Sequence, residues 1–325
     1  MSSPPRPKVL LTNPIHPDAH DRLARHADVV VAPATDDDTL RRAVADIDGL
    51  IVRTRLPDDV FAHQTRLRGV VRHGVGLDMI PVEQATQAGI PVANVPGSNT
   101  ESVVEYCLQA MFRHSRSLEA LRLPADASQW DAVRARALAT EELDCATLGI
   151  VGVGTIGGHL ARAALALGMK VLGLGHPGVR APSGVELVDK QILFASADVV
   201  ALTCPLTAET RGLVDAQALS WMRPTALLIN VARGPVVVRE ALMDSLRNGA
   251  IGAAVLDVHE VQPIPAGTYP VDLPNLTLTP HVAGITRTSM RRMSEGSVDE
   301  MIRMLQGKQF RNLVNPEVYP KGIQA

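Results

Sequence analysis

The stretch AVLDVHEVQP, from Ala254 to Pro263, places an aspartate, a histidine and a glutamate within four residues. Carboxylates and imidazoles often exchange protons in enzymes, and an unperturbed histidine titrates near neutral pH. Asp257, His259 and Glu260 are therefore candidates for acid–base chemistry. Asp257 is equally suited to capping a helix, so the elements around the stretch must decide which residue has a chemical role.

A glycine-rich stretch, GVGTIG, occupies residues 152–157 and matches the pattern G-x-G-x-x-G. An apolar, strand-like segment precedes it and a helix-forming segment follows it. In that context the first glycine allows a tight turn, the second lets the backbone approach a pyrophosphate, and the third lets helix and strand touch. The start of the helix offers N–H groups to the phosphates. The sequence therefore predicts a dinucleotide site formed by Gly152, Gly154, Thr155, Ile156 and Gly157.

The next strand-like segment, MKVLGLG at 169–175, ends without the acidic residue that usually binds the ribose 2′-hydroxyl of NAD. Gly175 occupies the expected position, and the next acidic residue is Glu186. The missing carboxylate removes a charge that would repel a 2′-phosphate, while His176 and Arg180 could attract one. This pattern favours NADP(H) over NAD(H), although both residues are equally well explained as solvated loop residues.

Two series of alternating strand-like and helix-like segments predict two parallel, doubly wound α/β sheets. The first series lies within residues 1–100, and its segment 35–46 begins with Thr35 as an expected helix N-cap. The second runs from about 147 to 284, and its apolar runs are typical of strands that are buried on both faces. We expect one domain at 101–284 and a discontinuous domain formed by 1–100 and 285–325.

Length and composition limit the class of protein. The 325 residues suffice for two domains, and the net charge of −2 gives no basis for binding nucleic acid or an anionic membrane. Cys107, Cys145 and Cys204 lie far apart, which argues against a zinc site or a disulfide framework. No apolar run predicts a membrane span, and the N-terminus does not resemble a signal peptide. We therefore expect a cytoplasmic protein without a bound metal.

Several motifs together resemble those of the D-isomer-specific 2-hydroxyacid dehydrogenases, a family that includes glyoxylate/hydroxypyruvate reductases, phosphoglycerate dehydrogenases and formate dehydrogenases. The resemblance covers almost the whole chain and rests on VRT at 52–54, HGVGLD at 73–78, SNTESVVE at 98–105, TCPLTAET at 203–210, NVARG at 230–234, LDVHEVQP at 256–263 and TPHVAG at 279–284. It implies a Rossmann cofactor domain, a flavodoxin-like substrate domain and hydride transfer between NAD(P)(H) and a small 2-hydroxy or 2-oxo acid.

The resemblance also implies roles for individual residues. Arg233 would hold the substrate carboxylate and carbonyl oxygen in a planar fork, and His281 would be the acid/base. The backbone amides of Val75 and Gly76 would form a carboxylate cradle, with Arg53 beside the substrate. Asp257 would lie beside the nicotinamide, whereas His259 and Glu260 would be peripheral. The other cofactor-lining residues would be Cys204, Pro205, Thr210, Val231, Ala232 and Gly284.

One position departs from the family pattern. Family members usually place a glutamate five residues after the aspartate and just before a proline, and this chain has Gln262 there. A carboxylate beside His281 would raise its pKa, whereas a neutral amide cannot do so but can orient the ring through a hydrogen bond. We therefore predict a lower pKa for His281 than a carboxylate partner would give, with reduction declining at a lower pH.

Two other functions stay open. Formate dehydrogenases also resemble this site in having glutamine beside the catalytic histidine, although VRT and HGVG look more like the oxo-acid reductases. Some relatives resemble dinucleotide-sensing corepressors with little turnover, against which Arg233 and His281 argue. The resemblance further implies a homodimer formed through the cofactor domain and the 110–145 arm. Arginines near the carboxylate cradle (Arg53, Arg55 and Arg72, with His73) leave open a substrate with a second anionic group.

Overall fold

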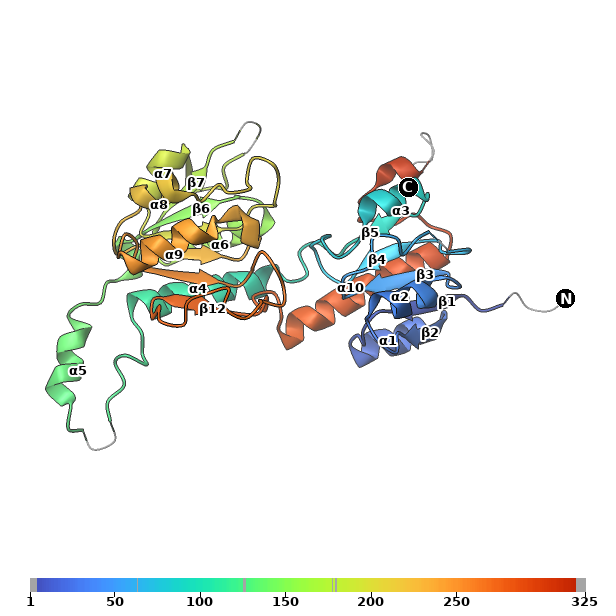
Figure 1. Cartoon of the computed structure of the whole chain (residues 1–325), viewed down its shortest axis with the longest axis horizontal. Coiled ribbons are helices and arrows are strands. Elements are labelled where there is room, and N and C mark those ends of the chain that lie inside the picture. Colours follow the sequence, from blue (N-terminus) through green and yellow to red (C-terminus); the bar gives the residue numbers. More distant parts are fainter. Residues whose placement is uncertain (1–4, 63, 125–126, 177, 179, 320–325) are drawn as a thin grey trace. The chain divides into compact units, whose positions relative to one another are not determined.

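The computed structural model describes residues 5–62, 64–124, 127–176, 178 and 180–319. The chain forms two compact units (Figure 1). The first unit comprises Met1–Asn99 and Ile285–Ala325, and the second comprises Thr100–Gly284. Both units are built on all-parallel sheets, so the predicted pair of parallel α/β domains is confirmed.

The first unit contains a five-stranded sheet in the order β2-β1-β3-β4-β5, the arrangement of flavodoxin-like folds. Helices α2 and α3 pack on one face of the sheet, and α1 and α10 pack on the other. The strands are β1 (Lys8–Leu11), β2 (Asp28–Val31), β3 (Gly49–Val52), β4 (Val70–Arg72) and β5 (Val92–Ala93), and the helices are α1 (Pro17–Ala24), α2 (Asp37–Val44), α3 (Val82–Gln87), α10 (Arg287–Leu305) and the 3₁₀ helix η3 (Pro316–Val318).

The helix predicted from residue 35 begins slightly later than expected. The side chain of Asp36 accepts a hydrogen bond from Thr39 N at 3.0 Å, so Asp36 is the N-cap of α2 and the expectation for Thr35 is wrong. A carboxylate both satisfies the free amide and interacts favourably with the helix dipole.

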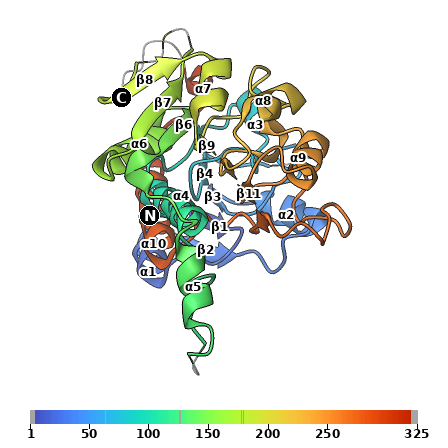
Figure 2. The same ribbon diagram turned by 90° about the vertical axis from the view of Figure 1, so that its left-hand side faces the viewer.

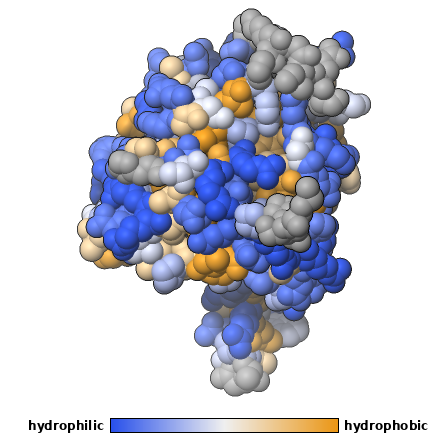
Figure 3. Space-filling view, turned by 90° about the vertical axis from the view of Figure 1, so that its right-hand side faces the viewer, coloured by the Kyte–Doolittle hydropathy of each residue, from blue (hydrophilic) through white to orange (hydrophobic). Residues whose placement is uncertain are grey.

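On the face of the molecule shown in Figure 3, hydrophilic residues predominate and apolar residues are scattered.

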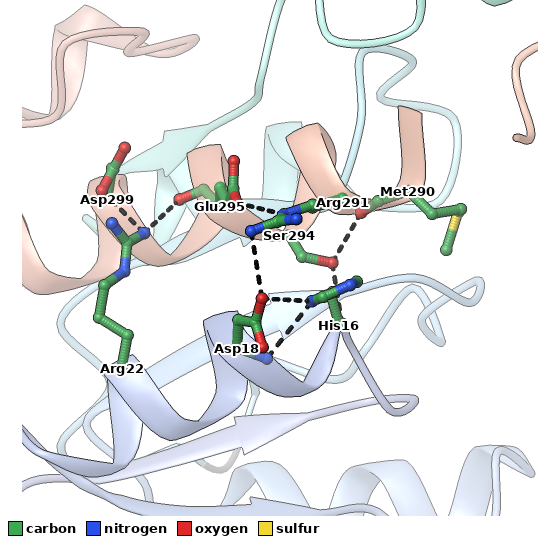
Figure 4. A network of polar contacts seen from close by, with 8 residues as sticks. All are labelled: His16, Asp18, Arg22, Met290, Arg291, Ser294, Glu295 and Asp299. Atoms are coloured by element: carbon green, nitrogen blue, oxygen red, sulfur yellow. Dashed lines mark hydrogen bonds and ion pairs between the residues drawn. The ribbon is translucent and has the colours of Figure 1, made fainter. Parts of the chain in front are cut away.

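Helix α10 returns from the end of the second unit to complete the first, where polar contacts fasten it to α1 (Figure 4). The Oγ of Ser294 accepts a hydrogen bond from His16 N at 3.1 Å. Arg22 forms an ion pair with Asp299 at 2.8 Å, and Arg291 forms one with Asp18 at 3.1 Å. These contacts join segments more than 270 residues apart and hold α10 against α1.

The second unit contains a seven-stranded sheet in the order β12-β11-β10-β9-β6-β7-β8. Helices α4 and α6 cover one face, and α7, α8 and α9 cover the other (Figure 2). The strands are β6 (Thr147–Val151), β7 (Lys170–Leu174), β8 (Val185–Val188), β9 (Val199–Leu202), β10 (Leu227–Asn230), β11 (Ala253–Leu256) and β12 (Leu276–Leu278), and the helices are α4 (Thr100–Ser115), α5 (Trp130–Ala137), η1 (Leu143–Cys145), α6 (Thr155–Ala166), α7 (Lys190–Ser196), α8 (Ala216–Trp221), η2 (Gly234–Val236) and α9 (Arg239–Arg247).

The strand order reverses beside β6, which fixes where a ligand can bind. The chain proceeds outward through β7 and β8, then returns to β9 on the other side of β6. Val151 at the end of β6 lies opposite Leu202 at the end of β9. In open α/β sheets, ligands bind at the carboxyl ends of strands where the order reverses. The glycine-rich turn at 152–157 follows β6 at this point.

Candidate active site

The turn between β6 and α6 requires its glycines. Gly152 has a φ of +100°, and a Cβ there would lie 2.7 Å from the Cys204 backbone. A Cβ at Gly157 would lie 2.2 Å from the carbonyl oxygen of Gly152. At Gly154, the N-cap of α6, an added Cβ would meet nothing within 4 Å. The turn is thus closely packed on its inner side and open at the start of the helix, a geometry that fits a diphosphate.

The end of β7 carries no carboxylate. Gly175 follows the strand and donates its N–H to the carbonyl of Val188 at 2.8 Å, and His176 beside it is exposed. Glu186, the next acidic residue along the chain, lies on β8 and forms an ion pair with Lys170 at 3.1 Å. Its carboxylate is therefore engaged at the amino-terminal end of β7, away from the position where a ribose acid is expected.

Asp257 follows β11 and is buried, with 1% of its surface exposed. Its Oδ1 accepts hydrogen bonds from Thr279 Oγ1 at 2.6 Å and Val282 N at 2.7 Å. Its Oδ2 accepts one from Ala283 N at 2.8 Å. The carboxylate therefore organises the turn at 279–283. This task cannot be read from the sequence around Asp257, because the donors come from a segment more than twenty residues away.

His281 lies in that turn, with a left-handed φ of +58°. Its N–H donates to the carbonyl of Asp257 at 2.8 Å, and its ring Nδ1 lies 2.9 Å from Gln262 Oε1. The amide nitrogen of Gln262 donates to the carbonyl of His259 at 3.3 Å. Because a carbonyl can only accept, this contact orients the amide with Oε1 toward the imidazole. Nδ1 must then carry the proton, so neutral His281 has Nε2 as its basic nitrogen.

His259 is held by hydrogen bonds on both of its ring nitrogens. It is buried, and its Nε2 donates to the carbonyl of Thr279 at 2.9 Å. Its Nδ1 then accepts from the hydroxyl of Tyr269 at 3.1 Å. Glu260 is exposed. Within AVLDVHEVQP, the side chain of Gln262 contacts the ring of His281.

Arg233 lies in the turn after β10, and the side chain of Asn230 shapes this turn. Asn230 Nδ2 donates to the Arg233 carbonyl at 3.0 Å, while its Oδ1 accepts from Ala232 N at 3.0 Å. Asn230 was not among the predicted site residues. Its position as the polar end of the apolar strand LLIN could have indicated a role in the turn that follows. A Cβ at Gly234 would lie 2.2 Å from the carbonyl carbon of His259. The Arg233 turn therefore packs directly on the backbone that leads to Gln262.

The other predicted cofactor residues follow β9 and β10 or end the second unit. Cys204 is buried against the Gly152 turn, and burial raises the pKa of its thiol. Val231 donates its N–H to Leu202 at 3.3 Å. Thr210 Oγ1 donates to the Pro205 carbonyl at 2.7 Å, which closes the loop after β9. Ala232 is buried, and Gly284 is the last residue of the unit.

In the first unit, the predicted carboxylate cradle is held by side chains that sequence analysis did not assign to that task. Asn94 Nδ2 donates to the Val75 carbonyl at 2.8 Å, and Arg72 Nε donates to the Gly76 carbonyl at 3.0 Å. Because a trans peptide directs its N–H opposite its carbonyl, Asn94 orients the amide of Gly76. Arg72 also donates to the carbonyls of Val52 and His73.

The charged groups near this cradle differ from one another in their surroundings. Arg53 donates to the Pro14 carbonyl, and burial lowers the pKa of its guanidinium. His73 is buried with its Nε2 2.8 Å from Ser294 Oγ. Burial, with the nearby charges of Arg53 and Arg72, lowers the pKa of His73 to about 3. A neutral His73 cannot attract a second anionic group of a substrate. Arg55, which was also considered for that role, is exposed.

Neither a metal site nor a membrane-spanning helix is found in the described part of the chain. No group of three histidine, cysteine, aspartate or glutamate side chains there is arranged to hold a metal ion. Within those same residues, no helix has both the length and the apolar character needed to cross a membrane. Cys107, Cys145 and Cys204 are free thiols.

The fold and the glycine turn together define a dinucleotide-binding α/β protein. A family model described as "D-isomer specific 2-hydroxyacid dehydrogenase, NAD binding domain" matches residues 108–283. The chain belongs to the D-isomer-specific 2-hydroxyacid dehydrogenase family, as its motifs predicted. The prediction of NAD(H) or NADP(H) as the cofactor is likewise confirmed.

Individual relatives resemble the chain over different lengths. It is 40% identical over 268 residues to (S)-sulfolactate dehydrogenase from Chromohalobacter salexigens, covering 80% of this chain and 85% of that protein. It is 33% identical over 325 residues to D-3-phosphoglycerate dehydrogenase from Methanocaldococcus jannaschii, covering 97% of this chain but only 60% of that longer protein. A structure of NADPH-dependent glyoxylate/hydroxypyruvate reductase from Sinorhizobium meliloti, in complex with NADP and malonate, is 28% identical with a TM-score of 0.79, covering 97% of this chain and 98% of that one.

Proposed function

We propose that the protein is an NAD(P)(H)-dependent reductase of small 2-oxo acids, with His281 as the proton donor and Arg233 as the substrate-binding residue. The observation that carries the proposal is the contact between His281 Nδ1 and Gln262 Oε1 at 2.9 Å. It leaves Nε2 as the nitrogen that exchanges a proton. The Arg233 turn packs on the backbone of His259 and Glu260, just before Gln262. The names of the relatives support a small 2-oxo or 2-hydroxy acid.

Each residue would have a distinct task in the reaction. The bound dinucleotide would supply the hydride to the carbonyl carbon. The imidazolium of His281 would donate its Nε2 proton to the carbonyl oxygen, since that oxygen gains negative charge as reduction proceeds. Arg233 would bind the carboxylate and polarise the carbonyl through its planar guanidinium. In the first unit, the amides of Val75 and Gly76, with Arg53 beside them, would form a cradle for a carboxylate.

A panel of 2-oxo acids, including glyoxylate, hydroxypyruvate and sulfopyruvate, tests this proposal with NADH and NADPH in parallel. We expect turnover of at least one acid, and loss of that turnover in Arg233→Ala. Arg247→Ala is the matched control, because Arg247 is an exposed arginine of the same unit that pairs with Asp244. Tight cofactor binding without turnover of any acid would instead support a dinucleotide-sensing protein.

Formate oxidation is the second candidate, and the neutral amide of Gln262 beside His281 favours it. Formate releases its hydride without giving up a proton to a base, so a carboxylate that raises the pKa of the histidine is not required. Reduction of NAD⁺ or NADP⁺ by formate, compared with oxidation of NADH or NADPH by 2-oxo acids, separates the two functions directly.

For the cofactor, we propose a preference for NADP(H). Gly175 at the end of β7 and the exposed His176 beside it support this preference, because neither residue brings a carboxylate that would repel a 2′-phosphate. The ratio of kcat/KM for NADPH and NADH, measured with the same acid, tests it. A ratio below one would contradict the proposal.

We also propose that the protein is cytoplasmic and forms a homodimer through the 110–145 segment. Four large apolar side chains of that segment are exposed and support a covered surface, namely Phe112 at 48% exposed, Leu118 at 75%, Trp130 at 56% and Leu138 at 89%. Apolar side chains gathered on one projecting segment are typical of association sites. Sedimentation velocity of the wild type and of Trp130→Glu tests this, with a monomeric wild type as the contradicting result.

A further inference from the structure

Tyr106 on helix α4 is connected to the turn that carries His281. Its hydroxyl lies 2.7 Å from Thr279 Oγ1, and Thr279 Oγ1 lies 2.6 Å from Asp257 Oδ1. An ionised carboxylate can only accept, so Thr279 donates to Asp257. The hydroxyl of Thr279 has one proton, and Tyr106 must therefore be the donor to Thr279. Partial burial raises the pKa of Tyr106, which keeps this donor protonated.

Thr279 lies where several hydrogen bonds of the turn meet. Its carbonyl accepts from His259 Nε2 at 2.9 Å and from His281 N at 3.0 Å. Its own N–H donates to the Leu256 carbonyl at 3.0 Å. Hydrogen bonds thus connect Thr279 to Leu256 at the end of β11, to Asp257 and to His281. A displacement of Thr279 would consequently move His281.

The backbone of His281 needs this support. A positive φ is unfavourable for a residue with a Cβ and persists only where the surroundings impose it. At His281 the surroundings are the Asp257 carbonyl, which binds His281 N, and the Asp257 carboxylate, which binds Val282 N and Ala283 N. Tyr106, through Thr279, fixes the one oxygen of that carboxylate that also holds Val282.

We infer that Tyr106 is a positioning residue: through Thr279 and Asp257 it holds the His281 turn in its left-handed conformation and so sets the direction of the imidazole. This inference rests on the proposed function only in taking His281 as the proton donor. Thr279 and Asp257 lie between Tyr106 and His281 in this network. The loss of the Tyr106 hydroxyl should therefore affect the turnover step more than the affinity for either ligand.

Tyr106→Phe removes the donated hydrogen bond and keeps the ring. We expect kcat for 2-oxo acid reduction to fall about ten- to hundredfold, because small displacements of a catalytic group have effects of that size. KM and the Kd for the dinucleotide should change much less than kcat does. Thr279→Val should lower kcat by the same factor, whereas Thr279→Ser should retain wild-type kcat because it keeps the hydroxyl. The double variant Tyr106→Phe/Thr279→Val should lower kcat no further than Thr279→Val alone, because both changes break the same chain of hydrogen bonds.

The matched control is Tyr319→Phe, which removes a partly buried tyrosine hydroxyl from the first unit. A second readout does not depend on activity: the ring ¹⁵N chemical shifts of His281 report its tautomer and surroundings. We expect these shifts to change in Tyr106→Phe and to stay unchanged in Tyr319→Phe. Unchanged His281 shifts in Tyr106→Phe would overturn the inference, whatever the enzyme activity. An inactive wild type with changed shifts would overturn only the proposed reaction.

Discussion

Replacing Gln262 with glutamate changes one charge beside His281 and little else. The oxygen at this position lies 2.9 Å from His281 Nδ1, and both side chains are exposed. The centres of a carboxylate and an imidazolium in this geometry are roughly 4 Å apart, and in water-like surroundings their attraction is about 1 kcal/mol. One pKa unit corresponds to about 1.4 kcal/mol. The pKa of His281 should therefore be about 0.7 higher in Gln262→Glu than in the wild type.

The pH dependence of reduction measures this difference. The imidazolium is the reactive form, so kcat/KM for a 2-oxo acid falls as the pH rises through the pKa of His281. A higher pKa moves this fall to higher pH. On the basic limb, Gln262→Glu should be about fivefold more active than the wild type relative to the plateau, which is the fold-change that corresponds to 0.7 units.

Glu260→Gln is the control for a general effect of charge on this loop. Glu260 is exposed and lies two residues from Gln262. We expect its removal to leave the basic limb within about 0.2 units of the wild type, because a solvated charge farther from the ring is strongly screened. A basic limb that stays in place in Gln262→Glu would refute the reasoning about the partner of His281.

Three further predictions follow from the structure. The pKa of His73 is about 3 in the folded chain and about 6.5 in the unfolded chain, so the protein loses stability as the pH falls from 6.5 toward 3. Urea unfolding should give a free energy of unfolding about 2 kcal/mol lower at pH 5 than at pH 8. His73→Gln should remove this difference. Gly157→Ala, whose Cβ would lie 2.2 Å from the Gly152 carbonyl, should weaken dinucleotide binding more than tenfold by calorimetry, whereas Gly158→Ala, with its nearest contact at 3.8 Å, should bind normally. Gly175→Asp should lower the NADPH-to-NADH ratio of kcat/KM about tenfold, since a carboxylate there would repel a 2′-phosphate; an unchanged ratio would mean that the cofactor ribose binds elsewhere.

The fold was accessible from the sequence because its main signals are local. Strands buried on both faces are continuous apolar runs, as in β9 and β10, and the glycines at 152–157 satisfy constraints that act within one turn. Short strands give weaker signals in the sequence. β5 has two residues, too few to show a pattern, and β8 alternates only partly. The cap of α2 was misplaced by one residue, because Thr35 and Asp36 are both good caps.

The details of the site were much less accessible, because they depend on hydrogen bonds between distant segments. Asp257 was recognised as important, but its partners Thr279, Val282 and Ala283 were not. The contact between Tyr106 and Thr279 joins residues 173 positions apart. Such pairs leave no spacing in one sequence from which they could be inferred. Gln262 was identified because the family pattern predicts another residue at its position.

The central claim is that the imidazole of His281 donates the proton during reduction. Its removal without disturbing the backbone tests this claim most directly. His281→Asn suits the purpose, because asparagine tolerates the left-handed conformation that this position requires. The account predicts that kcat for 2-oxo acid reduction falls by roughly 10²- to 10⁴-fold while the Kd of the dinucleotide stays unchanged. A variant that retains kcat within about fivefold of the wild type, well short of that loss, would contradict it.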